Sequence, residues 1–411
     1  MVTIAKTKDG SKRPLVNVVV PTYNRLRRLR LALASIWSQQ GLGEAFDLEP
    51  IVVDDASPEP AEEVVRAFPG TRYVRLDANR GLAVARNAGL AEASGDYVAF
   101  LDDDDLWLPD RLFAQVAALE AGTEPEIAYG RSFVCMHDGS WYVDPPDEGP
   151  SGLIFEHVYK QESSNLFTML IPRAVFEKVG GFDETFPDAA NGMVEGIETD
   201  LVLRLALIFP FRYVPGVVTV IIPSPANHRE PQVRQQVVLL RKEKILALSK
   251  GQPNESDIAR VVSTVTQWHV VRRYRLAGDQ EGTRRELLVW LEQIPSPLRD
   301  PWATSRLSQV VVHVALASDR PVETASALAG EIEGSGRRAG VDTGPLLADT
   351  WTRLALALAS RPRRDDRLAA RAALRAIASD PRRPLSRPGL VRLLARGIRR
   401  PKQRLGSQRA V

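Results

Sequence analysis

Short apolar segments alternate with helix-patterned segments over the first 110 residues, and this alternation is what most constrains the fold. Val16–Val20 is β-branched and ends at Pro21, as expected of a buried strand. The expected strands are 16–20, 49–53, 72–76 and 97–101, and the expected helices are 26–40, 60–67 and 81–93. Such alternation predicts parallel βαβ units, and so a doubly wound, mostly parallel α/β sheet.

The sequence changes character near residue 229, where helical patterns take over and the charge reverses. Residues 1–235 carry a net charge of −12 and residues 236–411 carry +15, so the overall +3 describes neither half. Expected helices cover 229–250, 255–276, 280–293, 303–317, 321–335, 344–360, 365–379 and 388–399. We therefore expect a polar tail over 1–13, an α/β domain over 14–228, a helical domain over 229–380 and a basic tail over 381–411.

Missing features exclude several classes of protein. The single cysteine, Cys135, rules out an internal disulfide framework and a cysteine-based zinc site. No apolar run reaches the roughly 18 residues that span a bilayer, and the polar N-terminus does not resemble a signal peptide. No G-x-G-x-x-G follows the first expected strand and no P-loop motif occurs, which disfavours a dinucleotide site and a P-loop enzyme.

Polar side chains follow three of the four expected strands. Thr22, Tyr23 and Asn24 come after the first strand, Asp54-Asp55 after the second, and Asp102–Asp105 after the fourth. Ligands bind open α/β sheets outside the carboxyl ends of their strands. Because carboxylates recur at this edge, we expect a binding site there rather than ordinary polar turns.

The four consecutive aspartates carry the strongest chemical signal. Ionised carboxylates in one loop repel one another unless a cation or hydrogen-bond donors compensate. In an extended chain, Asp102 and Asp104 point one way while Asp103 and Asp105 point the other. This spacing predicts a Mg²⁺ or Mn²⁺ site that also holds substrate phosphates. The competing interpretation is a solvated acidic turn before the helix expected from Pro109.

Five ordered motifs over about residues 15–225 resemble those of the family 2 glycosyltransferases, which have the GT-A fold. The motifs are VVVPTYNR at 18–25, IVVDDAS at 51–57, NRG at 79–81 with ARNAG at 85–89, the segment Gly95–Trp107 with its D-x-D, and GGFDE at 180–184. The resemblance implies inverting transfer of a sugar from a nucleotide-sugar donor to a hydroxyl acceptor, assisted by Mg²⁺ or Mn²⁺. The implied acceptor is a glycan or a lipid-linked molecule.

The resemblance also implies which residues bind the donor. The implied nucleotide-sugar-binding residues are Pro21, Thr22, Tyr23, Asn24, Asp55, Arg86, Asp102 and Asp103. Asp55 would contact the nucleobase, and Asp104 and Asp102 would hold the metal. His228 is a third implied metal ligand, with an exposed loop histidine as the alternative. Arg86 either reaches the diphosphate or braces the strand-end acids.

The implied general base lies in the segment Gly196–Arg204, which resembles the family's E-D-x-D-L-x-x-R helix start. Alignment on Arg204 puts Glu198 at the position where the family usually has an aspartate. Asp200 and Glu195 are the alternatives. A purely structural interpretation is that these acids favour a helix N-terminus.

The basic tail, 381–411, contains ten arginines and lysines and no acid. Its apolar residues among arginines suit a short amphipathic helix on an anionic membrane surface, which predicts a cytoplasmic protein held peripherally at the inner face. A solvated tail or an oligomer contact is the alternative, and nucleic acid is disfavoured. Two other functions fit part of the pattern. One is a non-catalytic GT-A-like scaffold whose helical half recruits partners, and the other is a nucleotidyltransferase, which the missing glycine-rich basic first loop disfavours.

Overall fold

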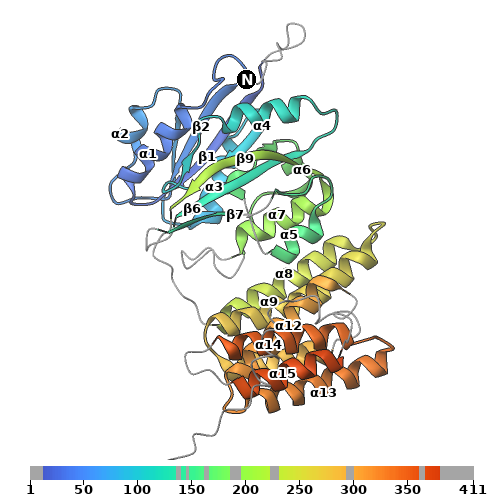
Figure 1. Cartoon of the computed structure of the whole chain (residues 1–411). Helices are drawn as coiled ribbons and strands as arrows, with labels where there is room; N and C mark the ends of the chain where they lie inside the picture. The colour runs from blue at the N-terminus through green and yellow to red at the C-terminus, as the bar shows by residue number, and fades with distance from the viewer. Residues whose placement is uncertain are drawn as a thin grey trace, which may run out of the picture. The chain divides into compact units, whose positions relative to one another are not determined.

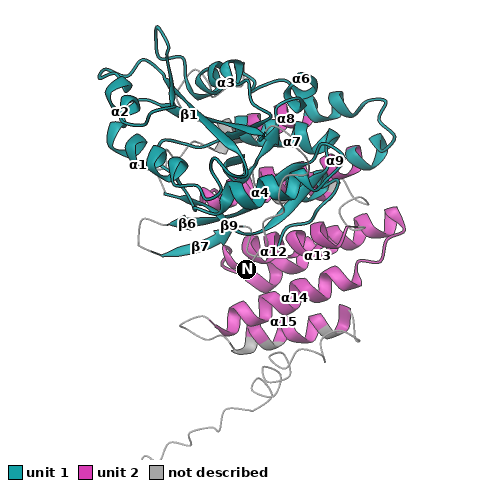
Figure 2. Cartoon of the chain, turned by 90° about the horizontal axis from the view of Figure 1, so that it is seen from above, with its two compact units in different colours: residues 1–229, 243–258 teal, residues 230–242, 259–411 magenta. Residues whose placement is uncertain are grey.

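A computed structural model describes residues 13–135, 140–144, 148–161, 166–185, 196–222, 231–292, 300–360 and 366–379. The chain divides into two compact units, coloured separately in Figure 2: residues 1–229 with 243–258, and residues 230–242 with 259–411. Helices α8 (Pro231–Ser249) and α9 (Glu255–Leu276) contribute residues to both units. The first unit is mainly α/β and the described part of the second is helical, which confirms the predicted fold class.

A five-stranded sheet organises the first unit, in the order β3-β2-β1-β4-β8. Its neighbouring strands β1 and β2 are labelled in Figure 1. Its strands are β1 (Leu15–Thr22), β2 (Asp47–Asp54), β3 (Arg72–Arg75), β4 (Tyr97–Phe100) and β8 (Ile171–Pro172). β1 pairs in parallel with β2 and β4, β2 pairs in parallel with β3, and β8 is antiparallel at the edge. The carboxyl ends of β1, β2 and β4 therefore meet at one edge, as the sequence predicts.

Helices cover both faces of this sheet. The helices of the unit are α1 (Leu26–Trp37), α2 (Glu62–Arg66), α3 (Leu82–Glu92), α4 (Arg111–Glu120), α5 (Phe155–Gln161), α6 (Val175–Val179) and α7 (Ile197–Ile208). Leu33 of α1 and Val116 of α4 share one core with Val18 of β1. A Cβ on Gly89 of α3 would collide with Val19, whose side chain alternates with that of Val18. Gly89 thus lets α3 approach the opposite face of the sheet.

The first helix ends earlier than the expected limit at Gln40. α1 stops at Trp37, and the chain then turns through Gly41 and Gly43, whose φ angles are +81° and +77°. Residues with a Cβ rarely adopt these angles, so the glycines set the turn that leads into β2.

A second sheet, in the order β5-β9-β6-β7, completes the α/β unit. Its strands are β5 (Leu106–Trp107), β6 (Ile127–Cys135), β7 (Trp141–Asp144) and β9 (Phe211–Ile221). β9 runs parallel to β6 and antiparallel to β5. Just beyond β9, the Ile222 amide donates to Asp105 Oδ1 over 2.9 Å, so this sheet is tied to the acidic turn.

The second unit is built from helices around its own apolar core. Besides its parts of α8 and α9, its helices are α10 (Gln280–Glu292), α12 (Pro301–Leu316), α13 (Pro321–Ala339), α14 (Gly344–Ala359) and α15 (Asp366–Ser379). Trp268, Trp290 and Trp351 lie in this core. The bounds agree with the expected helices to within a few residues, while the helix expected over 388–399 falls outside the described residues. Among the described helices, none combines the length and apolarity that crossing a membrane requires.

Candidate functional site

A pocket of about 430 Å³ opens where β1, β2 and β4 end. Eight of the predicted site residues line it: Pro21, Thr22, Tyr23, Asp55, Asp102, Asp103, Asp104 and Glu198. The predicted donor, metal and base residues did not include other lining residues, among them Arg25, Asp105 and Ile222. Of these three, Arg25 and Asp105 do lie in segments that the sequence singled out, 18–25 and 102–105. The expected edge therefore does carry a pocket, and residues from 21 to 222 converge on it.

The acidic segment is a turn rather than an extended chain. The Asp105 amide donates to the Asp102 carbonyl over 3.2 Å, which closes a four-residue turn. Asp102, Asp104 and Asp105 consequently bring carboxylate oxygens within 4.8 Å of one another. The expectation that Asp105 points away from Asp102 and Asp104 was wrong, because alternation of side chains holds only for extended backbone. Three hard oxygen donors in one cluster fit a divalent cation such as Mg²⁺ or Mn²⁺.

Asp103 faces the end of β1 instead. Its Oδ2 accepts a hydrogen bond from Thr22 Oγ1 at 2.7 Å, and its Oδ1 accepts one from Arg25 Nη1 at 3.1 Å. Asp104 Oδ2 accepts from Arg25 and from Arg28, at 2.9 and 3.0 Å. Two arginines near the start of α1 therefore offset part of the negative charge of the turn.

This compensation is incomplete, as the pKa values of the turn show. Burial and, to a smaller extent, the neighbouring Asp102 together raise the pKa of Asp105 to about 8, against the opposing hydrogen bond from the Ile222 amide. Burial likewise raises the pKa of Asp103 to about 6, although Thr22 and Arg25 favour its charged form. These carboxylates are held where ionisation is costly, and a bound cation would remove that cost.

Asp55 and Asn24 are fixed by backbone contacts. Asp55 is buried, and its two carboxylate oxygens accept the Arg80 and Gly81 amides at 2.7 and 2.9 Å. Asn24 has a φ of +56° and its amide donates to Ser57 Oγ, and it is not among the residues that line the pocket. The NRG motif thus shapes the Asp55 side of the pocket through its backbone.

Arg86 joins the acidic turn to Glu198. It is fully buried, and its Nη2 donates to Asp102 Oδ1 at 2.7 Å while its Nη1 donates to Glu198 Oε1 at 2.9 Å. It does not line the pocket, so of the two expected placements the structure has the one in which Arg86 braces the acids. Burial raises the pKa of Glu198, and Asp102 adds to this, while Arg86 opposes it.

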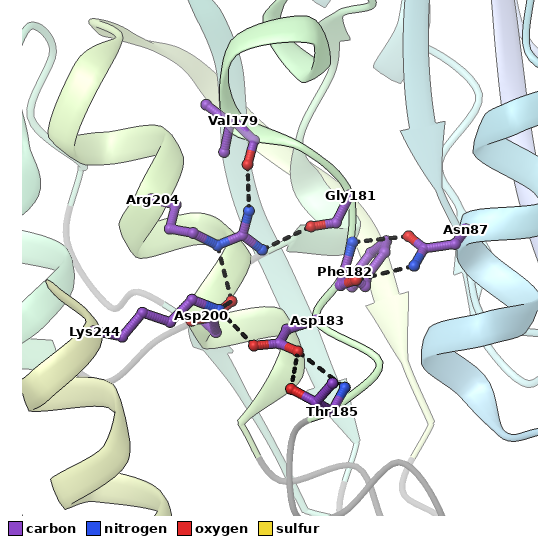
Figure 3. Close-up of polar contacts among 9 residues, drawn as sticks. All are labelled: Asn87, Val179, Gly181, Phe182, Asp183, Thr185, Asp200, Arg204 and Lys244. Atoms are coloured by element: carbon purple, nitrogen blue, oxygen red, sulfur yellow. Dashed lines mark hydrogen bonds and ion pairs between the residues drawn. The ribbon is translucent and has the colours of Figure 1, made fainter. Parts of the chain in front are cut away.

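Asp200 points away from the pocket, which does not fit its candidacy as the base. It is completely buried, and its Oδ2 accepts from Arg204 Nε and from Lys244 Nζ, both at 2.9 Å (Figure 3). Residues two positions apart in a helix are separated by about 200° around its axis, so Glu198 and Asp200 face different sides of α7. The remaining alternative, Glu195, and the implied metal ligand His228 lie outside the described residues.

The sheet, its acidic turn and the carboxylate facing that turn define a GT-A domain. Residues 17–178 match the family model described as glycosyl transferase family 2. This segment belongs to that family.

Curated relatives match part of the chain. A protein of Haemophilus influenzae named "Uncharacterized glycosyltransferase" is 30% identical over 170 residues, which is 41% of this chain and 56% of that protein. The succinoglycan biosynthesis protein ExoO of Rhizobium meliloti is 38% identical over 112 residues, covering 27% of this chain and 31% of that protein. The matches span between about a third and somewhat over half of these relatives' own lengths.

Solved structures resemble the chain more distantly. The structure of S. aureus TarS 1-349 in complex with UDP-GlcNAc covers 79% of this chain and 92% of that chain, with 17% identity and a TM-score of 0.48. The assignment to the family does not depend on this likeness.

Proposed function

We propose that this protein is an inverting glycosyltransferase that moves a sugar from a nucleotide-sugar to a hydroxyl acceptor, assisted by a divalent metal. The family membership of residues 17–178 supports glycosyl transfer. The names of the relatives include a polysaccharide biosynthesis protein, which supports a glycan or a lipid-linked precursor as the acceptor. The α/β unit would carry the chemistry, and the helical region would be a separate domain.

One observation carries the proposal: a single buried arginine holds a carboxylate of the acidic turn and a carboxylate of α7 at the same pocket. Arg86 contacts Asp102 and Glu198, which lie 96 residues apart in the sequence and both line the pocket. A metal-diphosphate site and a proton acceptor must lie on either side of the anomeric carbon for direct displacement. Arg86 supports that arrangement of the two groups.

The donor side would be formed by the ends of β1, β2 and β4. Asp55 and Tyr23 would contact the base and ribose, and Asp102, Asp104 and Asp105 would hold the metal. When bound, Mg²⁺ or Mn²⁺ supplies charge neutralisation for the nucleoside diphosphate as it leaves. Arg25 and Arg28, which contact Asp104, lie where they could also pair with diphosphate oxygens.

Glu198 would act as the general base. Its carboxylate accepts the proton of the acceptor hydroxyl while the acceptor oxygen attacks the anomeric carbon from the face opposite the diphosphate. The bond between that carbon and the diphosphate oxygen breaks, the nucleoside diphosphate leaves with the electron pair, and the configuration inverts. The raised pKa of Glu198 suits a base, because it makes the carboxylate a better proton acceptor.

A thermal-shift panel tests the donor site before any acceptor is known. UDP, GDP, dTDP, ADP and their common sugar conjugates are each added with Mn²⁺ and with a chelator. We expect one nucleotide to raise the melting temperature only when Mn²⁺ is present, since ligand at 100 times its Kd stabilises a protein by about 2.7 kcal/mol. Release of that nucleoside diphosphate from its nucleotide-sugar then measures turnover. A flat response to every nucleotide would favour the scaffold alternative.

A further inference from the structure

Lys244 is a basic residue of α8, beyond the matched family segment and beyond the second sheet. It belongs to the stretch 243–258 that is part of the first unit. We propose that Lys244 is a positioning residue for Glu198, acting as a clamp on the turn Gly180–Glu184 and on the first turn of α7. This inference rests on the proposed function, in which Glu198 is the base.

The clamp is an ion-paired cluster of two acids and two bases. Lys244 Nζ donates to Asp183 Oδ2 at 2.8 Å and to Asp200 Oδ2 at 2.9 Å, and it lies 2.9 Å from Asp200 Oδ1. Arg204 Nε donates to the same Asp200 Oδ2. The four charges balance, and Figure 3 shows the side chains converging from the turn, from α7 and from α8.

Arg204 extends the clamp to the backbone of the turn. Its Nη1 and Nη2 donate to the carbonyls of Val179 and Gly181, both at 2.7 Å. The charged cluster therefore fixes where the turn lies relative to α7. Loss of Lys244 would leave Asp200, which is fully buried, with one cation in place of two.

The turn connects onward to Arg86. On its other side, Asn87 accepts the Phe182 amide at 2.8 Å and donates to the Phe182 carbonyl at 2.9 Å (Figure 3). The Phe182 ring lies 5.3 Å from the guanidinium of Arg86. Arg86 in turn holds Glu198. A continuous set of contacts thus runs from Lys244 through the turn to the group that holds the proposed base.

A shorter route runs through α7 itself. Asp200 is two residues after Glu198, in the first turn of that helix. Lys244 and Arg204 hold Asp200 on one side of α7, which fixes the rotation of the helix and so the direction in which Glu198 enters the pocket. The two routes converge on the same carboxylate, and both contain Lys244.

Within the clamp, hydrogen bonds keep the Asp183 carboxylate ionised. Burial alone would raise the pKa of Asp183, but hydrogen bonds from Lys244 and Thr185 outweigh it and lower the pKa to about 2. Asp183 therefore remains ionised over the pH range in which enzymes of this kind are assayed, and its pairing with Lys244 persists.

The decisive variant is Lys244→Met, which keeps the length of the side chain and removes its charge. Lys244→Arg serves as the conservative rescue, and Lys250→Met, an exposed lysine just past the end of α8, as the matched control. With the nucleotide-sugar identified by the thermal-shift panel, we expect Lys244→Met to lower kcat by about 10- to 100-fold, because small misplacements of a reacting group cost this much. KM and the Kd of the nucleoside diphosphate should change less than about threefold, because the donor groups lie on other elements.

A second variant and a second readout keep the test decisive. Asp183→Asn removes the carboxylate partner of the same contact. The double variant, Lys244→Met with Asp183→Asn, should have a kcat little lower than that of Lys244→Met alone. Hydrogen exchange of the amides of 197–204 should speed up in both variants and not in Lys250→Met. The proposal would be overturned if Lys244→Met matched Lys250→Met in kcat and exchange, or if donor affinity fell together with kcat. If Lys244→Met does not fold, Asp183→Asn decides by the same criteria.

Failure of the proposed function would look different. Wild-type protein that released no nucleoside diphosphate from any nucleotide-sugar would contradict glycosyl transfer. The exchange of 197–204 would still show in that case whether Lys244 holds the start of α7.

Discussion

Two groups of carboxylates in the α/β unit have pKa values shifted in opposite directions. In the turn Asp102–Asp105, burial raises the pKa of Asp105 to about 8 and that of Asp103 to about 6. In the Lys244 cluster, hydrogen bonds lower the pKa of Asp183 to about 2. The first group has more acids than its arginines offset, and the second has one base for each acid.

The difference separates acids whose charge the described chain offsets only in part, in the turn Asp102–Asp105, from acids that are fully ion-paired, in the Lys244 cluster. Asp183 and Asp200 receive their cations from Lys244 and Arg204 within the chain. Asp102, Asp104 and Asp105 have oxygens gathered within 4.8 Å of one another, a geometry that favours an external cation. Perturbed carboxylates of this kind concentrate at functional sites, whereas fully paired ones are more often structural.

The largest expected effect comes from a substitution in the turn Asp102–Asp105. Asp104→Ala should lower the rate of transfer by about 10³-fold or more, since loss of a metal ligand removes several kcal/mol of leaving-group stabilisation. The unfolding free energy without ligand should stay within about 1 kcal/mol, because the residue is not part of the apolar core. Steady-state kinetics and urea unfolding measure the two quantities. Transfer that resisted both this substitution and a chelator would contradict the metal role.

Glu198→Gln should come next. Removing the proposed base while keeping its shape and its acceptor for Arg86 should lower kcat by about 10³-fold, in the middle of the range for general bases. Binding of the nucleoside diphosphate, measured by calorimetry, should be unchanged. A variant with wild-type kcat would show that another group takes the proton.

Asp200→Asn tests the Lys244 cluster, and we expect its effect in the unfolding free energy. The substitution removes the buried negative charge that Arg204 and Lys244 both contact. We expect this to lower the unfolding free energy by about 3 kcal/mol. Asp77→Asn, at an exposed loop position, is the control and should be close to neutral. Denaturant unfolding gives both values. Equal stability of the two variants would mean that the buried cluster contributes nothing net.

The smallest effect is the acid dependence of the Asp183 contact. The folded pKa of about 2 lies below the reference value of 3.8, so the contact stabilises the folded state fully above pH 4 or so. That contribution falls as the pH drops from 3.8 toward 2, because protons bind the unfolded carboxyl first. Unfolding free energies of wild type and Asp183→Asn should converge over this interval. Curves that stay parallel would indicate that Asp183 is not held by charge.

Local pattern predicted much of the architecture. The β-branched strands, the helix spacing and the strand-end acids are readable within windows of about ten residues, because side-chain periodicity reports the face that each element buries. This accounts for the close agreement between the expected and the observed bounds of β1, α3 and α9. It also accounts for the pocket at the predicted edge, since parallel strands bring their carboxyl ends together.

The same local reasoning failed where backbone geometry departs from a regular element. Asp105 joins Asp102 and Asp104 because the segment turns. Four consecutive aspartates carry no signal that separates a turn from an extended chain. The order of the second sheet was not predicted either, because β9 pairs with β6 across about 80 residues and with register shifts.

The sequence by itself determined the family resemblance, the two charge-distinct halves and the identity of eight of the residues that line the pocket. Only the tertiary structure decided that Arg86 links Asp102 to Glu198, that Asp200 faces Lys244, and that Lys244 reaches Asp183 over 61 positions of sequence. Periodicity tells which side of an element is buried, but not which other element covers it. The partners of a buried charge are set by chain packing, and the low dielectric there makes those partners decisive.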